Sequence, residues 1–254
     1  MDGLINMAIG FALACFRLLP LLVLPGLSPL AWAPGLVRIA VLMVFAAVLS
    51  LVGPITPETL SLQSPLSLAI SFLLEFVLGL AFALAMFMPV AALHFAARLA
   101  DTQAGFSAAN ILNPGLPQES ASVMGAALAM AAGVLFFLLN IHLDLLELLT
   151  GMLDLAPLGA SMLNLSPNKL LGLMSVQFMA GFLLLAPVIL GVFAIDVGAA
   201  FATRSMPQAN VYFLVLPLKV GAAIVVFAAT ARHIPLLLER MYATSLRALP
   251  SFVH

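Results

Sequence analysis

The chain has 254 residues, of which 64% are hydrophobic and only 7% are charged, and its formal net charge is −1. Soluble domains average about 25% charged residues. This composition, with a mean hydropathy of +1.23, therefore indicates an integral membrane protein or a subunit buried in a membrane assembly. The near-neutral charge excludes a nucleic-acid binder. A single cysteine, Cys15, excludes a disulfide-stapled secreted domain.

Apolar residues gather in six stretches, at residues 4–25, 36–53, 66–98, 120–150, 167–203 and 210–232. The runs are continuous rather than alternating, so they predict long hydrophobic helices and argue against a β-barrel. About 20 helical residues cross the hydrocarbon core, so the third, fourth and fifth stretches must tilt, kink or project beyond it. The links are too short for a separate soluble domain. We therefore expect one all-α, membrane-associated unit over residues 1–254.

Two further expectations concern the start and the orientation of the chain. We expect the first stretch to be retained rather than cleaved as a signal peptide, because Arg17 lies inside it and no basic start or convincing cleavage site is present. The link at residues 53–65 carries no Lys or Arg, which indicates the external side, yet six crossings would put the arginines of the tail on that same side. Either one long stretch is a re-entrant hairpin, or the chain is not inserted as ordinary spans.

The tail after Pro235 predicts an amphipathic helix, since proline is tolerated at the first helical position. Charged residues, among them Glu239 and Arg247, fall outside the apolar face. The sequence leaves open whether this face lies on a membrane or docks on a partner. The face consists of residues spaced by about three or four positions: Leu238, Met241, Tyr242, Leu246 and Leu249.

Four ionisable residues lie within the apolar stretches, where burial of charge is costly: Arg17, Glu75, Asp196 and Lys219. One interpretation is a proton relay or an ion pathway. The other is a pair that fixes packing, or a long side chain that reaches the interface. Glu75 lies in the middle of its stretch and needs a partner or a proton. We expect Asp196 to form a structural pair with Arg204, two turns further along.

The sequence contains no pattern for catalysis, for a cofactor or for a metal. The four histidines do not stand at helical ligand spacing, and the cysteine is far from them in sequence. A phosphate-binding loop and the common nucleophile signatures are missing. The thirteen methionines are scattered, which is typical of flexible packing residues rather than of a metal pathway. We therefore expect neither an enzyme nor a cofactor.

Residues 98–119 form the most polar interruption of the apolar pattern. Small, polar, proline and glycine residues dominate it, and Phe106, Ile111 and Leu112 are its bulky apolar members. Non-helical backbone at membrane depth is tolerated only where protein or water covers it. Two interpretations stay open on composition alone: a surface loop between two helices, or a loop that lines or plugs a passage.

A set of short motifs runs through almost the whole chain in a fixed order. The strongest is Pro207-Gln208-Ala209-Asn210-Val211-Tyr212, which Arg204 precedes and Pro217-Leu218-Lys219 follows. Together they resemble one family, the R component of the bacterial flagellar export gate (FliR) and its counterpart in injectisome type III secretion. The other members are Arg17-x-x-Pro20, Arg38, Glu75-x-x-x-Gly79, Asp101-x-Gln103-x-Gly105-Phe106-Ser107, Asn113-Pro114 and Asn140-x-His142.

The resemblance implies a subunit of a pore. In that family one R-type chain assembles with several P-type and Q-type subunits into a closed helical channel, next to the B-type switch protein. Residues 1–150 would form a P-like part with a central plug loop at 101–119, and residues 160–254 a Q-like hairpin and the amphipathic tail. We expect the complex in the bacterial inner membrane, raised towards the periplasm, with unfolded polypeptides as cargo and lipid as a neighbour.

The resemblance also implies roles for individual residues. The central loop would descend into the channel and close it, because a hydrophobic constriction excludes ions by dewetting. The residues of this seal would be Gly105, Phe106, Ile111 and Leu112. A second group would make structural polar contacts or contacts at subunit interfaces: Arg17, Glu75, Asp101, Gln103, Arg204, Gln208, Asn210 and Lys219.

The function implied is that of a structural and gating subunit of a type III protein export gate. The regions Asn140–His142 and Ala156–Gly159 favour the flagellar over the injectisome system. The alternative is a small-solute secondary transporter or channel acting alone, which predicts internal repeats and paired broken helices. A further alternative is a membrane-embedded assembly factor with no pore role.

Overall fold

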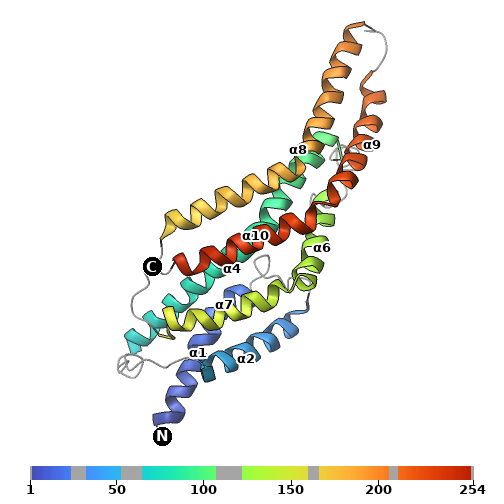
Figure 1. Cartoon of the computed structure of the whole chain (residues 1–254). Coiled ribbons are helices and arrows are strands. Elements are labelled where there is room, and N and C mark those ends of the chain that lie inside the picture. The colour runs from blue at the N-terminus through green and yellow to red at the C-terminus, as the bar shows by residue number, and fades with distance from the viewer. Residues whose placement is uncertain are drawn as a thin grey trace. The chain divides into compact units, whose positions relative to one another are not determined.

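The computed structural model describes residues 2–23, 33–52, 65–106, 122–159, 166–205 and 211–252. Within these ranges the chain is all-helical, as the apolar runs predict (Figure 1). The helices are α1 (Asp2–Leu22), α2 (Gly35–Val52), α4 (Pro65–Ala104), α6 (Val123–Leu138), α7 (Ile141–Leu155), α8 (Pro167–Ser205), α9 (Val211–Ala231), α10 (Ile234–Ala248) and the short 3-10 helix η1 (Leu249–Phe252).

The apolar stretches correspond to these helices with two differences. The stretch at 120–150 is divided into α6 and α7, because Asn140 adopts a left-handed conformation (φ 58°) that interrupts the helical hydrogen bonds. The third stretch continues as helix α4 through Ala104, so the first residues of the polar interruption are helical. Asparagine tolerates the left-handed region better than most residues, which explains the break at this position.

Four helices in the described part of the chain are long and apolar enough to cross a membrane, and five if α6 and α7 together form one broken span. The expected number was six. Helix α2 is a shorter apolar helix, which accounts for the difference. The conflict in orientation was derived by counting six crossings. With fewer candidate spans, that count no longer applies. Helices α4 and α8 contain 40 and 39 residues, about 60 Å each, which exceeds a straight span of the ~30 Å core.

The chain divides into two compact units, each assembled from segments that are far apart in sequence. The first unit comprises Met1–Met88, Phe136–Ser175 and Tyr242–His254, and the second comprises Pro89–Leu135 and Val176–Met241. Helices α4, α6, α8 and α10 therefore contribute residues to both.

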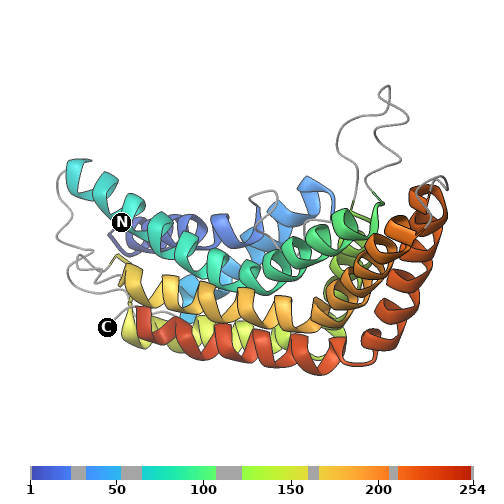
Figure 2. The same ribbon diagram turned by 90° about the horizontal axis from the view of Figure 1, so that it is seen from above.

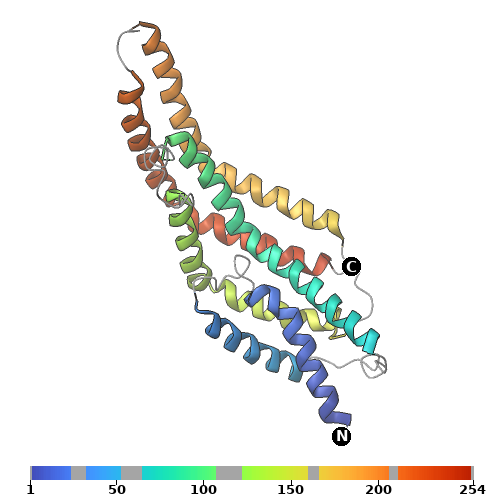
Figure 3. The same cartoon turned by 180° about the vertical axis from the view of Figure 1, so that it is seen from behind.

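In the first unit, α1 packs along α2, as the views in Figures 1 and 3 both show. The buried core of α1 and of the first half of α4 contains large side chains, including Leu18 and Phe82. Helix α7 buries one face at a spacing of three or four residues, which is the pattern of a helix packed on one side. This face consists of Ile141, Leu145, Leu149, Met152 and Leu153.

In the second unit, the end of α8 and the start of α9 run side by side as a hairpin (Figures 1 and 2). Helix α8 also packs closely on α4: a Cβ at Gly181 would lie 2.8 Å from the carbonyl oxygen of Ala92. The ring of Phe95 contacts the rings of Phe178 and Phe182 at centroid distances of 5.6 and 5.8 Å. The lack of a side chain at Gly181 and the edge-on ring contacts of Phe95 thus allow α8 to pack closely on α4.

The amphipathic helix expected after Pro235 is confirmed as α10. All five residues of the predicted apolar face are buried, whereas Glu239, Arg240 and Arg247 are exposed. The face is covered by this chain itself, so it needs neither the membrane surface nor a partner, the two options left open by the sequence. Burial raises the pKa of the Tyr242 hydroxyl, and the Tyr242 ring packs against Phe136 at 5.6 Å.

Candidate functional site

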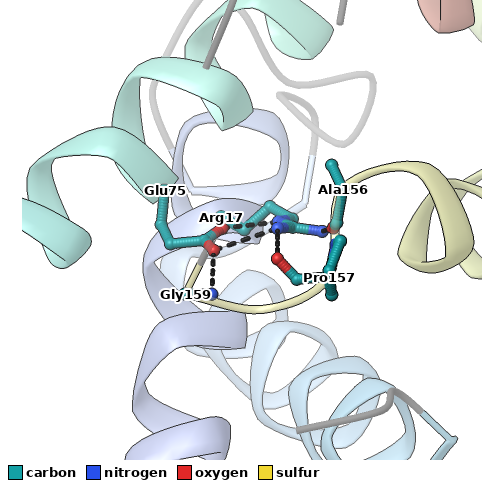
Figure 4. Close-up of polar contacts among 5 residues, drawn as sticks. All are labelled: Arg17, Glu75, Ala156, Pro157 and Gly159. Atoms are coloured by element: carbon teal, nitrogen blue, oxygen red, sulfur yellow. Dashed lines mark hydrogen bonds and ion pairs between the residues drawn. The ribbon is translucent and has the colours of Figure 1, made fainter. Parts of the chain in front are cut away.

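A buried ion pair joins α1 to α4 in the first unit. Arg17 Nε donates to Glu75 Oε2 at 2.5 Å and Arg17 Nη2 donates to Glu75 Oε1 at 3.0 Å, so the contact is bidentate (Figure 4). Both residues are only 3% exposed. Arginine suits this position because its planar guanidinium matches the two carboxylate oxygens and stays charged in a buried site.

The same pair also holds the corner that follows α7. Arg17 Nη1 donates to the carbonyl oxygen of Ala156 at 2.8 Å, and Nη2 donates to that of Pro157 at 3.3 Å. The backbone N–H of Gly159 donates to Glu75 Oε1 at 2.8 Å (Figure 4). Gly159 has a φ of 81°, which favours glycine. Two charged side chains therefore fix a turn more than 80 residues away in sequence.

This arrangement favours the packing interpretation of Arg17 and Glu75 over a proton relay. All three nitrogens of the guanidinium donate hydrogen bonds, and both carboxylate oxygens accept from Arg17. A buried pair with this geometry offsets much of its desolvation penalty, whereas loss of either partner leaves a charge uncompensated. The sequence did not predict that the corner at 156–159 binds this pair, because its backbone donors and acceptors carry no sequence signal.

A second polar cluster, in the second unit, joins the end of α4 to the start of α6. Asp101, which is buried, accepts hydrogen bonds from the Ser122 hydroxyl and, at 3.2 Å, from the backbone N–H of Met124. Ser122 Oγ in turn accepts from the backbone N–H of Gly125 at 2.8 Å. The two side chains thus cap the free N–H groups of the first turn of α6, where negative charge is also favourable. Ser122 was missed, although serine before an apolar run is a common helix start.

Helix α4 ends directly beside this cluster in a glycine cap. Gly105 has a φ of 87°, its N–H donates to the carbonyl of Thr102, and the N–H of Phe106 donates to the carbonyl of Asp101. This pair of bonds is the Schellman motif, which requires the left-handed region at the residue after the helix. Gln103 and Phe106 are half-buried. The predicted seal residues Ile111 and Leu112 lie outside the described residues, as do Gln208 and Asn210.

A third polar contact lies in the hairpin of α8 and α9. Lys219 Nζ lies 2.8 Å from Asp196 Oδ1 and 3.0 Å from Oδ2. The expectation that Asp196 pairs with Arg204 is therefore wrong. Residues eight apart on a helix are about 12 Å apart along its axis, whereas the antiparallel neighbour brings Lys219 to the same level. Arg204 is exposed in the last turn of α8.

The Asn140-x-His142 motif lies at the break between α6 and α7. His142 packs against Phe137, with ring centroids 5.3 Å apart, and its Nδ1 is buried without a hydrogen-bond partner. Over the residues that the structure describes, no group of three or more His, Cys, Asp or Glu side chains is placed to hold a metal ion. The buried charged residues Arg17, Glu75 and Asp101 each bind groups on other helices or on turns of the described chain.

The long apolar helices of the described ranges define an integral membrane protein that is helical throughout those ranges. The family model described as "Bacterial export proteins, family 1" matches residues 8–245, nearly the whole chain. The chain belongs to this family, which confirms the resemblance seen in its motifs.

Individual relatives come from both flagellar and secretion systems. The chain is 26% identical over 180 residues to the flagellar biosynthetic protein FliR of Bacillus subtilis, covering 69% of each chain. It is 26% identical over 172 residues to FliR of Escherichia coli, covering 66% of this chain and 65% of that protein. It is 27% identical over 215 residues to the Yop proteins translocation protein T of Yersinia pestis, covering 83% of this chain and 79% of the relative.

Proposed function

We propose that this chain is a structural and gating subunit of a type III protein export gate, through which unfolded polypeptides pass. Membership of the bacterial export family carries the proposal. The buried contacts of Arg17, Glu75 and Asp101 support a structural rather than a catalytic use of its charged residues. In this role the chain performs no enzymatic step and uses no cofactor.

The uncovered apolar surface supports a role inside a larger assembly. Only 6% of the apolar stretch in α9 and 28% of that in α8 are buried within this chain. We infer that P-type and Q-type subunits cover these helices, and that the B-type switch protein lies nearby. In this assembly, residues 1–150 act as a P-like part and residues 160–254 as a Q-like part. The complex lies in the bacterial inner membrane and is raised towards the periplasm.

Gating is assigned to the segment that begins at the glycine cap of α4. Gly105 and Phe106 start this segment, and Ile111 and Leu112 supply the other bulky apolar groups of the seal. The cluster of Asp101, Ser122 and Met124 supports the assignment, because it holds together the two helix ends from which the segment departs. Such a hydrophobic constriction blocks hydrated ions but yields to a polypeptide.

The remaining polar residues have assembly roles in this proposal. The hairpin turn between α8 and α9 uses Gln208 and Asn210 to bond freed backbone groups, with Arg204 at the end of α8. Gln103 lies next to the loop, half-buried, and contacts a neighbouring subunit. Arg17, Glu75 and Lys219 hold the helices in place for assembly through their ion pairs.

Native mass spectrometry tests the assembly role. The chain is purified alone and after co-expression with its P-type and Q-type subunits, and one copy in a multi-subunit complex is expected. A stable monomer or homodimer that ignores these subunits, combined with saturable solute uptake, would instead support a stand-alone transporter.

Two functional assays test the gate and the system. Deletion of residues 106–112 is expected to raise the ion conductance of cells that carry the assembled complex, and an unchanged conductance would contradict the plug. We assign the chain to the flagellar system, so it is expected to restore motility to a flagellar mutant lacking the R component. Restoration only of injectisome secretion would contradict that assignment.

A further inference from the structure

The glycine cap at the end of α4 lies directly against helix α9. A Cβ at Gly105 would lie 2.6 Å from Cδ1 and 3.9 Å from Cγ of Leu216, and both residues belong to the second unit. The Leu216 side chain thus fills the space beside the cap. Because Cδ1 is the flexible end of this side chain, a residue larger than glycine at position 105 would displace it.

Leu216 lies on the inward face of α9. Lys219 and Val220, three and four residues further on, are half-buried like Leu216, and Ala223 is fully buried. Leu214, two residues before Leu216, lies on the opposite face and is 74% exposed. The side chain of Leu216 is therefore directed at the second unit of its own chain rather than outward.

An ion pair holds α9 in place one turn beyond Leu216. Lys219 Nζ lies 2.8 Å from Oδ1 of Asp196 in α8. Pro217, which directly follows Leu216, lacks the N–H that would continue the helical hydrogen bonds of α9. The level at which Leu216 meets α4 therefore depends on side-chain contacts with neighbouring helices as well as on the backbone of α9.

The cap in turn determines where Phe106 leaves α4. The N–H of Phe106 donates to the carbonyl oxygen of Asp101 at 3.1 Å, and the N–H of Gly105 donates to that of Thr102 at 3.3 Å. These bonds fix the backbone of the cap, and Leu216 contacts the side on which a Cβ of residue 105 would lie. A change in the position of Leu216 therefore changes the support of Phe106, which is half-buried.

We propose that Leu216 is a positioning residue of the gate, which supports the Gly105–Phe106 cap from α9 and keeps Phe106 in its closed position. The inference rests on the proposed function, because it assigns α9 a part in closing the same seal. Leu216 acts by apolar packing, so a displacement of α9 relative to α4 is transmitted to Phe106.

Truncation of Leu216 separates this role from a purely structural one. Leu216→Ala is expected to raise the ion conductance of cells that carry the assembled complex by about fivefold or more, since loss of one apolar contact shifts a two-state equilibrium by that order. Native mass spectrometry is expected to recover the complex in normal amount. Leu216→Met, which nearly conserves the side-chain volume, should stay closed.

Two further variants keep the test decisive. Leu214→Ala is the matched control, because it removes the same atoms from an exposed position of α9, and it is expected to leave the conductance unchanged. Leu216→Val, a smaller truncation, provides the same comparison with Leu216→Met if Leu216→Ala lowers the recovery of the complex.

A double variant tests the route of the effect. Because Leu216 acts by positioning Phe106, the conductance of Phe106→Ala/Leu216→Ala is expected to be no higher than that of Phe106→Ala alone. A loss of stability that is unrelated to Phe106 would instead add its own leak to that of Phe106→Ala.

The opposing results are equally distinct. An unchanged conductance of Leu216→Ala, an equal leak of Leu214→Ala, or a further rise in the double variant would overturn the positioning role. The proposed function still stands in each case if deletion of residues 106–112 raises the conductance. If that deletion leaves the conductance unchanged, the plug and the positioning role both fail.

Discussion

Gly79 of α4 lies directly against the backbone of Arg17 in α1. A Cβ at Gly79 would lie 1.9 Å from the carbonyl oxygen of Arg17, closer than real Cβ atoms approach any neighbour. Gly79 follows Glu75 by four residues, so the glycine and the carboxylate occupy the same face of α4. The close approach of the two helices and the buried ion pair are therefore one arrangement.

Gly79→Ala is expected to push α1 away from α4 and to lengthen the Arg17–Glu75 contact. The added methyl group meets rigid backbone, so the variant should lose about 1–3 kcal/mol of unfolding free energy, as in other overpacked cores. Gly172→Ala in α8 is the matched control, because no atom lies within 4 Å of its added Cβ. Thermal unfolding in detergent, followed by circular dichroism, compares the two. Equal stabilities would contradict the close contact.

Single and double substitutions test the ion pair itself. Glu75→Leu leaves the Arg17 guanidinium buried without its counter-ion, and Arg17→Met leaves the carboxylate in the same state. Each is expected to cost about 3–5 kcal/mol, whereas the double variant should cost clearly less than their sum. Chemical unfolding of all four proteins gives this coupling energy. Additive losses would show that the two side chains act independently.

Removal of the capping side chains is expected to loosen the start of α6. Asp101→Ala and Ser122→Ala should each cost about 1–2 kcal/mol, and the double variant less than the sum, because the two side chains are bonded to each other. Thr102→Ala is the control, since its hydroxyl only bonds the carbonyl of Leu99 in its own helix. Ion conductance of cells carrying each complex should rise for Asp101→Ala and not for the control. An unchanged ion conductance for Asp101→Ala would contradict the idea that this cluster holds the gate in its closed position.

The left-handed conformation of Asn140 predicts an unusual order of substitutions. Asn140→Gly should be nearly neutral, because glycine adopts a positive φ without strain. Asn140→Val should cost about 1–3 kcal/mol, because a β-branched residue is strained there. Thermal unfolding measures both. A valine variant as stable as the glycine variant would show that the break between α6 and α7 does not depend on this residue.

Composition and apolar periodicity were sufficient for the class of protein and for most helices. Continuous apolar runs located α1, α2, α8 and α9, and the spacing of Leu238 to Leu249 located the buried face of α10 and the start of η1. These properties are local, because helix formation and sidedness depend on neighbours three or four residues apart. The order of the short motifs along nearly the whole chain identified the family, because these motifs are also properties of the sequence alone.

A kink was one of the options expected for the fourth stretch, but its position at Asn140 was not predicted, because the apolar pattern continues through the break. One residue in the left-handed region, Asn140, separates two helices that composition alone would join. In the described part of the chain the candidate spans number fewer than the six expected, because the second apolar run forms the shorter helix α2.

The partners of the charged residues depend on tertiary structure. The sequence shows that Arg17, Glu75 and Lys219 each need a counterpart, because isolated charge in an apolar run is costly. It does not show which one, since Arg17 and Glu75 are 58 residues apart and the Ala156–Gly159 corner offers only backbone groups. Asp196 illustrates the same limit: a neighbour along its own helix was expected, but the adjacent helix supplies Lys219. Helix packing brings such groups together, and packing is a property of the whole fold.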